Sequence, residues 1–124
     1  MLIISSDRKR ILYVEDNEDT ANAVRIILSN AGFDVDLAFC GGDGLAKCKT
    51  ASYDLILLDV MLPDMSGWEV YERLRKNFPV KYAFLSAIPI SQERLDQIGR
   101  EGISDYILKP VTKADLLKRI GKIV

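Results

Sequence analysis

Short runs of apolar residues alternate with longer amphipathic stretches along almost the whole chain. The apolar runs have the length of buried β-strands, and they predict five strands, at 10–14, 33–39, 54–58, 81–86 and 105–109. After each run, apolar residues recur every three or four positions, as they do on one face of an α-helix. These stretches predict five helices, at 18–32, 41–51, 66–78, 91–102 and 112–124.

Details of these segments predict where the elements lie and end. The strand at 33–39 alternates apolar and polar residues, so we expect it at an edge of the sheet, whereas the run at 54–58 is the most apolar and belongs at the centre. Gly32 is a natural stop for the first helix, and Ser66 and Thr112 are expected N-caps of the third and fifth helices. The first helix has an apolar face made of Ala23, Ile26, Ile27 and Ala31.

Five strands that are each followed by a helix predict an α/β fold, a doubly wound parallel sheet with helices on both faces. A length of 124 residues fits a single domain, 1–124, with a core from about residue 10. The formal net charge of -1 gives no strong global attraction to nucleic acid or to a membrane. No apolar run has transmembrane length, and the stretch before residue 10 is too polar for a signal peptide.

The cysteine and histidine content narrows the possible chemistry. Two cysteines cannot form a disulfide framework, so we expect a cytoplasmic protein with reduced thiols. The chain contains no histidine, which excludes Ser/His or Cys/His catalysis and histidine-based metal sites. If phosphohistidine chemistry is involved, another protein must therefore bring the histidine.

Polar residues with complementary chemistry stand at the ends of four predicted strands. Glu15 and Asp16 follow the first strand, Asp59 follows the third, and Ser86 and Lys109 end the fourth and fifth. In parallel sheets of this kind, ligands bind at the carboxyl ends of the strands, near the switch in strand order. We therefore expect three carboxylates, a hydroxyl and an ammonium group to converge on one edge of the sheet.

This set of groups suits a metal ion and a phosphoryl group. Two carboxylates about 4 Å apart repel each other by about 4 kcal/mol at an effective dielectric constant near 20, so three of them hold either protons or a cation. Carboxylates without histidine or cysteine favour a hard cation, and Mg²⁺ fits a site with few protein ligands. Lys109 and Ser86 suit a phosphoryl group, and Asp59 is a competent nucleophile that would form an acyl phosphate.

Taken singly, each of these residues also has an ordinary structural explanation. Glu15 and Asp16 could be first-turn acids that favour a helix dipole, and Asp59 could begin a turn. Ser86 could cap a helix, and Lys109 could be a solvated strand end. The convergence of four strand ends on complementary chemistry favours the functional interpretation over these alternatives.

Four motifs give the chain a close resemblance to the receiver domain of two-component response regulators. They are "VEDNE" with the acid pair, "LLDVMLPDMSG" with the acceptor, "FLSA" with the hydroxyl and "YILKP" with the lysine. The resemblance extends from about Arg10 to Val124 and implies a (βα)5 flavodoxin-like fold with strand order 2-1-3-4-5. It also implies a signalling phosphoacceptor that catalyses only its own phosphorylation and dephosphorylation, with Mg²⁺ as cofactor.

The same resemblance implies roles for single residues around the acceptor. Asp59 would be the phosphoacceptor and a metal ligand, and Asp16 would bind Mg²⁺ directly. Glu15 would act directly or through water, and the backbone carbonyl of Met61 would complete the protein ligands.

Further roles concern the response to phosphorylation. Lys109 would contact a phosphate oxygen, and Ser86 would hydrogen-bond the phosphoryl group after a short inward move. Tyr106 matches the aromatic residue that changes rotamer with that move. The Lys109–Pro110 peptide bond matches one that is usually cis in the family.

The implied partners are a histidine kinase or histidine phosphotransfer protein and a downstream effector or output domain. A phosphorylation-dependent homodimer is a further possibility, on the face formed by 91–102, 105–109 and 112–124. No nucleic-acid or membrane contact is expected.

Two other classes of protein are disfavoured by single features of the sequence. An FMN-binding flavodoxin is disfavoured because "EDNED" would repel phosphate, and a haloacid-dehalogenase phosphatase is disfavoured because Met61 stands where its second acid should be. The remaining alternative is a receiver-fold interaction module that works without phosphorylation.

Overall fold

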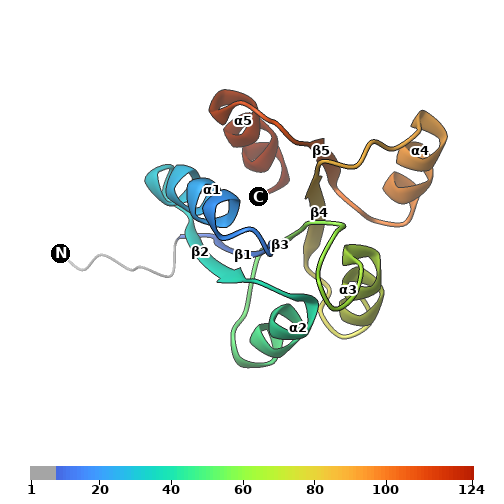
Figure 1. The fold of residues 1–124 in the computed structure, drawn as a ribbon, viewed down its shortest axis with the longest axis horizontal. Helices are drawn as coiled ribbons and strands as arrows, with labels where there is room; N and C mark the ends of the chain where they lie inside the picture. Colours follow the sequence, from blue (N-terminus) through green and yellow to red (C-terminus); the bar gives the residue numbers. More distant parts are fainter. Residues whose placement is uncertain (1–7) are drawn as a thin grey trace.

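The computed structural model describes residues 8–124, in which five parallel strands form one sheet of order β2-β1-β3-β4-β5. This confirms the predicted sheet and its strand order. Figure 1 shows the strands in the middle of the molecule with helices packed around them. The strands are β1 (Arg10–Val14), β2 (Asp34–Ala38), β3 (Leu55–Leu58), β4 (Lys81–Ser86) and β5 (Asp105–Leu108).

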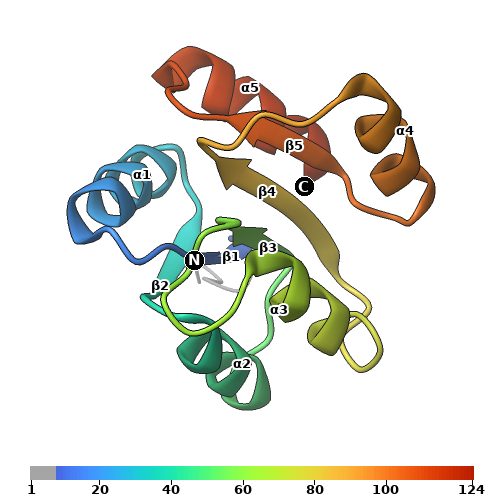
Figure 2. The ribbon, with the colours of Figure 1, turned by 45° about the vertical axis from the view of Figure 1, so that its right-hand side comes forward.

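Helices cover both faces of the sheet, as a doubly wound topology requires. α1 and α5 lie together on one face, and α2, α3 and α4 lie on the other (Figures 1 and 2). The five helices are α1 (Glu18–Asn30), α2 (Gly41–Thr50), α3 (Gly67–Leu74), α4 (Gln92–Arg100) and α5 (Lys113–Ile123).

The strand β3 lies at the centre of the sheet and separates two hydrophobic cores. Its side chains alternate between the two faces: Leu55 and Leu57 pack under α1 and α5, and Ile56 and Leu58 pack under the other three helices. All four are buried, which explains why this run is continuously apolar. The strand β2 is an edge strand whose side chains are mostly half-buried, as its alternating pattern predicts.

The inward face of α1 differs from the prediction. Its buried residues are Ala21, Val24 and Leu28. Of the four predicted residues, Ala23, Ile26 and Ala31 are exposed and Ile27 is only half-buried. The helix carries two adjacent apolar stripes, and the smaller of the two packs on the sheet. The other stripe lies mostly at the surface: Ile27 packs partly against the core, and Ile26 is 52% exposed.

The predicted helix ends agree with the structure in several places. Ser66 and Thr112 cap α3 and α5 by accepting hydrogen bonds from backbone N–H groups three residues further on. Gly32 follows α1 with a φ of 101°, a conformation that favours glycine. The third helix ends at Leu74, four residues earlier than predicted. Among the described residues, no helix is long and apolar enough to cross a membrane, and the predicted absence of a signal peptide concerns a stretch that lies mostly outside them.

Candidate functional site

Backbone hydrogen bonds continue one residue beyond the strands and hold the residues that follow them. The N–H of Glu15 donates to Ala38 O at 2.9 Å, and the N–H of Asp59 donates to Val14 O at 3.0 Å. The N–H of Lys109 donates to the carbonyl of Ser86 at 2.8 Å. Because neighbouring strands hold these peptide groups, the three side chains emerge at the same edge of the sheet.

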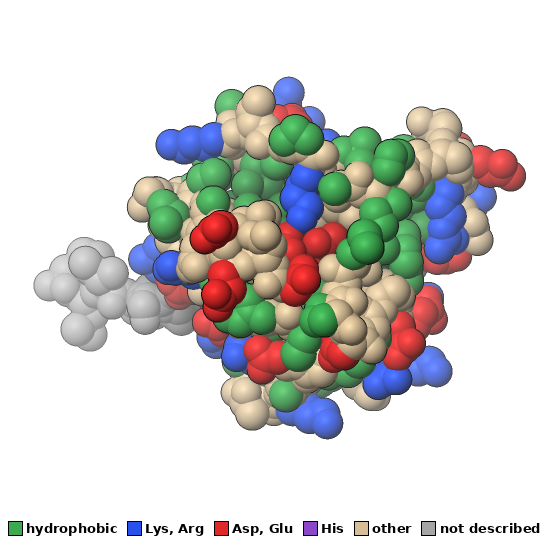
Figure 3. All heavy atoms as spheres, in the orientation of Figure 1, with side chains coloured by type: hydrophobic (Ala, Val, Ile, Leu, Met, Phe, Trp, Pro, Cys, Tyr) green, Lys and Arg blue, Asp and Glu red, His purple; other side chains and the backbone are tan. Residues whose placement is uncertain are grey.

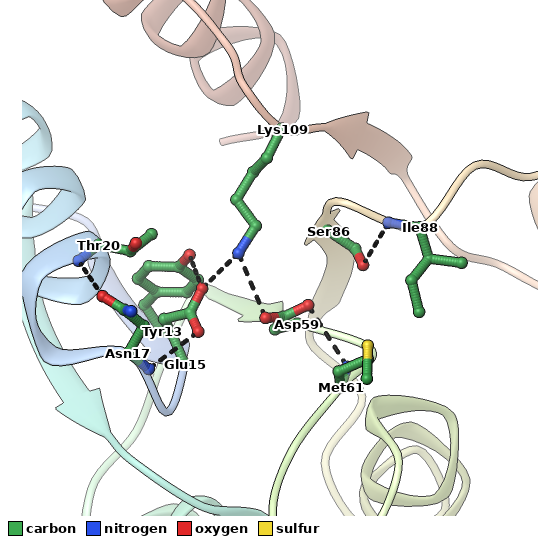
Figure 4. A network of polar contacts seen from close by, with 9 residues as sticks. All are labelled: Tyr13, Glu15, Asn17, Thr20, Asp59, Met61, Ser86, Ile88 and Lys109. Atoms are coloured by element: carbon green, nitrogen blue, oxygen red, sulfur yellow. Dashed lines mark hydrogen bonds and ion pairs between the residues drawn. The ribbon is translucent and has the colours of Figure 1, made fainter.

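Lys109 bridges two carboxylates at this edge, as Figure 4 shows. Its Nζ lies 2.5 Å from Glu15 Oε1 and 3.2 Å from Asp59 Oδ2. Glu15 is only 2% exposed and Asp59 only 6%, which is rare for acids unless they are paired. The structure therefore brings together the acid, the acceptor and the lysine expected from three different strand ends.

Two further donors fix the carboxylate of Glu15, and the sequence interpretation missed both. The hydroxyl of Tyr13 donates to Glu15 Oε1 at 3.1 Å, and the backbone N–H of Asn17 donates to Oε2 at 3.1 Å. A signal for Tyr13 was present, because residues two apart in a strand point to the same side of the sheet. Burial and the adjacent Glu15 raise the pKa of Tyr13, so its hydroxyl remains a donor at neutral pH.

Burial and neighbouring charges together shift the pKa values of Glu15 and Lys109. Burial raises the pKa of Glu15, and repulsion by Asp59 adds to this against the opposing hydrogen bonds from Lys109 and Asn17. Burial lowers the pKa of Lys109, but the attraction of Glu15 and Asp59 outweighs it, so the net shift is upward. Both pKa shifts favour the protonated form of the group.

The donor set fits a hard divalent cation. Glu15, Asp16 and Asp59 each offer a carboxylate oxygen, and these oxygens lie within 4.8 Å of one another. Asp16 is exposed while the other two are buried, so the cluster opens to solvent on one side. Figure 3 shows acidic side chains gathered at the centre of this face, directly below a basic one. All three ligands are oxygen atoms, which suits Mg²⁺ better than a soft metal.

The loop after β3 folds back tightly toward Asp59. Met61 and Ser66 form an isolated antiparallel bridge, and the N–H of Gly67 donates to Val60 O at 2.8 Å. A Cβ atom on Gly67 would lie 2.0 Å from the carbonyl oxygen of Asp59, so only glycine allows the two backbone segments to approach this closely. The loop thereby keeps the Met61 backbone beside Asp59, with its amide nitrogen 3.4 Å from Asp59 Oδ1.

Asp64 anchors the same loop to the second helix. Its carboxylate accepts hydrogen bonds from the N–H groups of Gly41 and Gly42, both at 2.8 Å, at the start of α2. These two bonds lower the pKa of Asp64. Asp64 therefore caps α2 from the loop after β3.

Ser86 and Tyr106 are connected through the backbone of Ile88. Ser86 is fully buried, and its Oγ accepts a hydrogen bond from the N–H of Ile88 at 3.2 Å. Tyr106 is also buried, and its hydroxyl donates to the carbonyl of Ile88 at 2.6 Å. The Tyr106 ring stacks with Phe84 and Trp68 at centroid distances of 5.8 and 6.2 Å. Figure 4 places Ser86 on the side of Asp59 away from Glu15.

Comparison with known proteins identifies the family. The model of the response regulator receiver domain matches residues 11–121, which is most of the chain. The chain therefore belongs to the response regulator receiver domain family. The expected cis peptide bond between Lys109 and Pro110 is also present.

Several of the curated relatives are named as transcriptional regulatory proteins. The chain is 41% identical over 112 residues to the transcriptional regulatory protein DltR of Streptococcus agalactiae, covering 90% of this chain and 50% of that protein. It is 39% identical over 114 residues to the transcriptional regulatory protein CusR of Escherichia coli K12, covering 90% and 49%. The chain thus spans about half the length of the curated relatives it matches.

Solved receiver domains share the fold. A CheY-like receiver domain from Methanospirillum hungatei superimposes with a TM-score of 0.84 at 35% identity, covering 93% of this chain and 92% of that one. The response regulator TrrA of Thermotoga maritima, solved in complex with Mg²⁺-BeF, gives a TM-score of 0.80 at 27% identity, covering 94% and 99%. The protein is a receiver domain of two-component response regulators, and its acidic cluster fits a phosphoacceptor role. A module that works without phosphorylation is not favoured.

Proposed function

We propose that Asp59 accepts a phosphoryl group from a phosphohistidine of a partner protein, and that residues 1–124 form one receiver domain. Glu15, Asp16, Asp59 and the backbone carbonyl of Met61 would hold Mg²⁺. The observation that carries this proposal is the lysine bridge, in which a single ammonium group serves two buried carboxylates beside a third, exposed one. One cation for three acids leaves a place for a second cation.

The chemical step follows from the positions of these groups. A carboxylate oxygen of Asp59 attacks phosphorus, a P–O bond forms, the P–N bond to the partner's imidazole breaks, and its electron pair returns to that nitrogen. Bound Mg²⁺ would neutralise charge on the phosphoryl oxygens. Lys109 already lies 3.2 Å from Asp59, so its ammonium group needs only a short movement to reach a phosphoryl oxygen.

The response to phosphorylation would begin at Ser86. A phosphoryl group adds negative charge and strong hydrogen-bond acceptors, and Ser86 would turn its hydroxyl toward one of them. That turn breaks the hydrogen bond that Ser86 Oγ accepts from the N–H of Ile88. Because the carbonyl of Ile88 holds the Tyr106 hydroxyl, the change would pass to Tyr106 and to the aromatic stack with Trp68.

An apolar groove beside the acceptor suits a partner helix. The groove has a volume of about 430 Å³, lies between α1 and the loop after β5, and its lining includes Ala23, Ile27, Lys109, Pro110 and Val111. The exposed Ile26 lies on the same helix. We propose that the histidine kinase or phosphotransfer protein docks here, because the exposed apolar stripe of α1 would be covered within reach of Asp59.

The face formed by α4, β5 and α5 would carry the output. Leu108 is 44% exposed on it, and the Arg94 guanidinium lies 4.8 Å from the ring centroid of Trp68, which connects α4 to the aromatic stack. We propose an effector, an output domain or a second phosphorylated copy as the partner of this face, and no direct contact of this domain with nucleic acid or membrane. Catalysis limited to its own phosphorylation and dephosphorylation, and a cytoplasmic location, stay predictions.

The direct test is the intact mass of the protein after incubation with acetyl phosphate and Mg²⁺. We expect one added phosphoryl group in the wild type and none in Asp59→Asn or after chelation with EDTA. Asp64→Asn is the matched control, because it removes a carboxylate from the same loop, and it should still be labelled. Labelling that persists in Asp59→Asn, or that is lost equally in both variants, would sink the assignment of the acceptor.

A further inference from the structure

We propose that Tyr13 is a positioning residue of this site, whose hydroxyl keeps the Glu15 carboxylate oriented toward the cation when Lys109 turns to the phosphoryl group. The inference rests on the proposed function. It assigns a role to Tyr13, which is neither a proposed metal ligand nor the proposed acceptor. Tyr13 reaches Glu15 from within the core, as Figure 4 shows.

The phenol of Tyr13 is held rigidly. The residue is fully buried in the hydrophobic core under α1 and α5, where it packs with Ile11, Leu57 and Leu85. Only its hydroxyl reaches the polar edge, where it lies 3.1 Å from Glu15 Oε1. A ring fixed in this way presents its hydroxyl at one place, so the hydrogen bond also fixes the direction of the carboxylate.

The importance of this hydroxyl follows from how the donors are shared. Glu15 Oε1 accepts from Tyr13 and Lys109, whereas Oε2 accepts from the N–H of Asn17. When Lys109 moves to a phosphoryl oxygen, Oε1 loses its charged donor, and the Tyr13 hydroxyl becomes its only donor within residues 8–124. With phenylalanine at position 13, Oε1 would then have no donor from this part of the chain, and a buried acceptor left unpaired is unfavourable.

A second tyrosine, in the segment just before β3, provides a matched control. The hydroxyl of Tyr53 donates to Asp36 Oδ2 at 2.7 Å, and Arg10 contacts the same oxygen at 3.0 Å. The three groups are again a tyrosine, a carboxylate and a cation, but they lie at the amino ends of the strands, away from the acceptor. Tyr53→Phe therefore removes the same kind of hydrogen bond without touching the proposed metal ligands.

The test is the affinity for Mn²⁺ in the presence of beryllium fluoride, which takes the place of the phosphoryl group so that Lys109 can turn to it. Free Mn²⁺ is measured by electron paramagnetic resonance. We expect Tyr13→Phe to weaken binding by about tenfold, as is typical when a partner of a metal ligand is removed, and Tyr53→Phe to bind like the wild type. In a Glu15→Gln background, adding Tyr13→Phe should have no further effect, because Tyr13 acts through Glu15.

The outcomes separate the inference from the proposed function. Equal Mn²⁺ affinity in Tyr13→Phe and the wild type would overturn the role of Tyr13 alone, and so would a further loss in the Glu15→Gln background. A wild type that does not bind Mn²⁺ would overturn the metal site itself. Labelling by acetyl phosphate at saturating Mg²⁺ distinguishes misfolding from mispositioning: we expect Tyr13→Phe to need more Mg²⁺ and then to reach the wild-type rate. A rate that stays low at saturation would contradict positioning.

Discussion

The two ends of the sheet carry the same three kinds of group in different proportions. At the amino ends, Asp36 accepts hydrogen bonds from Arg10 and Tyr53. At the carboxyl ends, Glu15 accepts from Lys109 and Tyr13. Asp36 and Arg10 have side chains that are 41% exposed, whereas the side chain of Glu15 is only 2% exposed.

Burial and charge balance decide what each end does. At the amino ends, two carboxylates have an arginine each, since Arg8 pairs with Asp34 as Arg10 pairs with Asp36. At the carboxyl ends, one lysine serves two buried acids, and Asp16 adds a third carboxylate. The same three kinds of group therefore form neutralised surface ion pairs at the amino ends and a site with excess negative charge at the carboxyl ends.

The largest expected effect comes from backbone packing, which is tight only at the carboxyl end. Gly67→Ala places a Cβ atom against the carbonyl of Asp59, and we expect it to lower the free energy of unfolding by more than about 3 kcal/mol. Gly32→Ala, near the amino end, meets no atom within 4 Å but strains a positive φ, which costs about 1–2 kcal/mol.

Urea unfolding followed by circular dichroism measures both glycine variants. Gly99→Ala is the control, because Gly99 lies in α4 with open space around it and alanine is the better helix former. If Gly67→Ala and Gly32→Ala lose the same stability, the tight approach at Asp59 is not what distinguishes the two ends.

Removing the cation from each end gives the next largest contrast. Lys109→Ala leaves Glu15 and Asp59 buried without their ammonium group, so we expect the metal-free protein to lose about 3 kcal/mol. Arg10→Ala breaks a half-exposed pair and should cost about 1 kcal/mol or less.

Thermal unfolding with and without Mg²⁺ sharpens this contrast. Mg²⁺ should raise the melting temperature of Lys109→Ala more than that of the wild type, because the competing ammonium group is gone. Arg10→Ala should respond to Mg²⁺ like the wild type. A Lys109→Ala protein that Mg²⁺ does not stabilise would mean that the lysine helps to build the cation site rather than competing for it.

The smallest expected effect concerns Asp64, whose carboxylate accepts hydrogen bonds from the first N–H groups of α2. Its pKa is lowered from the ordinary 3.8 by hydrogen bonds from Gly42 and Gly41, so its ionised form stabilises the folded protein. This contribution is complete above pH 3.8 and is lost as the pH falls through the lower pKa of the folded state. The melting temperatures of the wild type and Asp64→Asn should therefore converge in acid. A constant difference down to the lowest pH at which the protein folds would contradict this.

The polar edge at the carboxyl ends of the strands could be predicted from the sequence because of one general property of parallel sheets. Strand ends that lie far apart in the chain meet in space, so Glu15, Asp59 and Lys109 could be grouped before any coordinates were known. The structure brings these three together as expected. Their roles in binding Mg²⁺ and a phosphoryl group remain predictions that the experiments above address.

Features that depend on tertiary packing could not be predicted from the sequence in this way. The apolar pattern of α1 fits two stripes, and only packing against the sheet selects Val24 and Leu28 over Ile26. The capping of α2 by Asp64 joins residues 23 positions apart through a loop whose path no local pattern fixes. The contact of Tyr13 with Glu15 could have been found, because both lie on the same side of one extended segment.

The peptide hydrogen bonds that hold Glu15, Asp59 and Lys109 have a consequence for engineering. They use groups that every residue except proline carries, so the position of the site does not depend on the identity of surface side chains. Because docking on α1 is a separate proposal, substitutions in its exposed stripe should change partner choice while leaving the geometry at the strand ends unchanged. In this fold, partner recognition and phosphoryl chemistry would then depend on separate sets of residues, which can be changed one at a time.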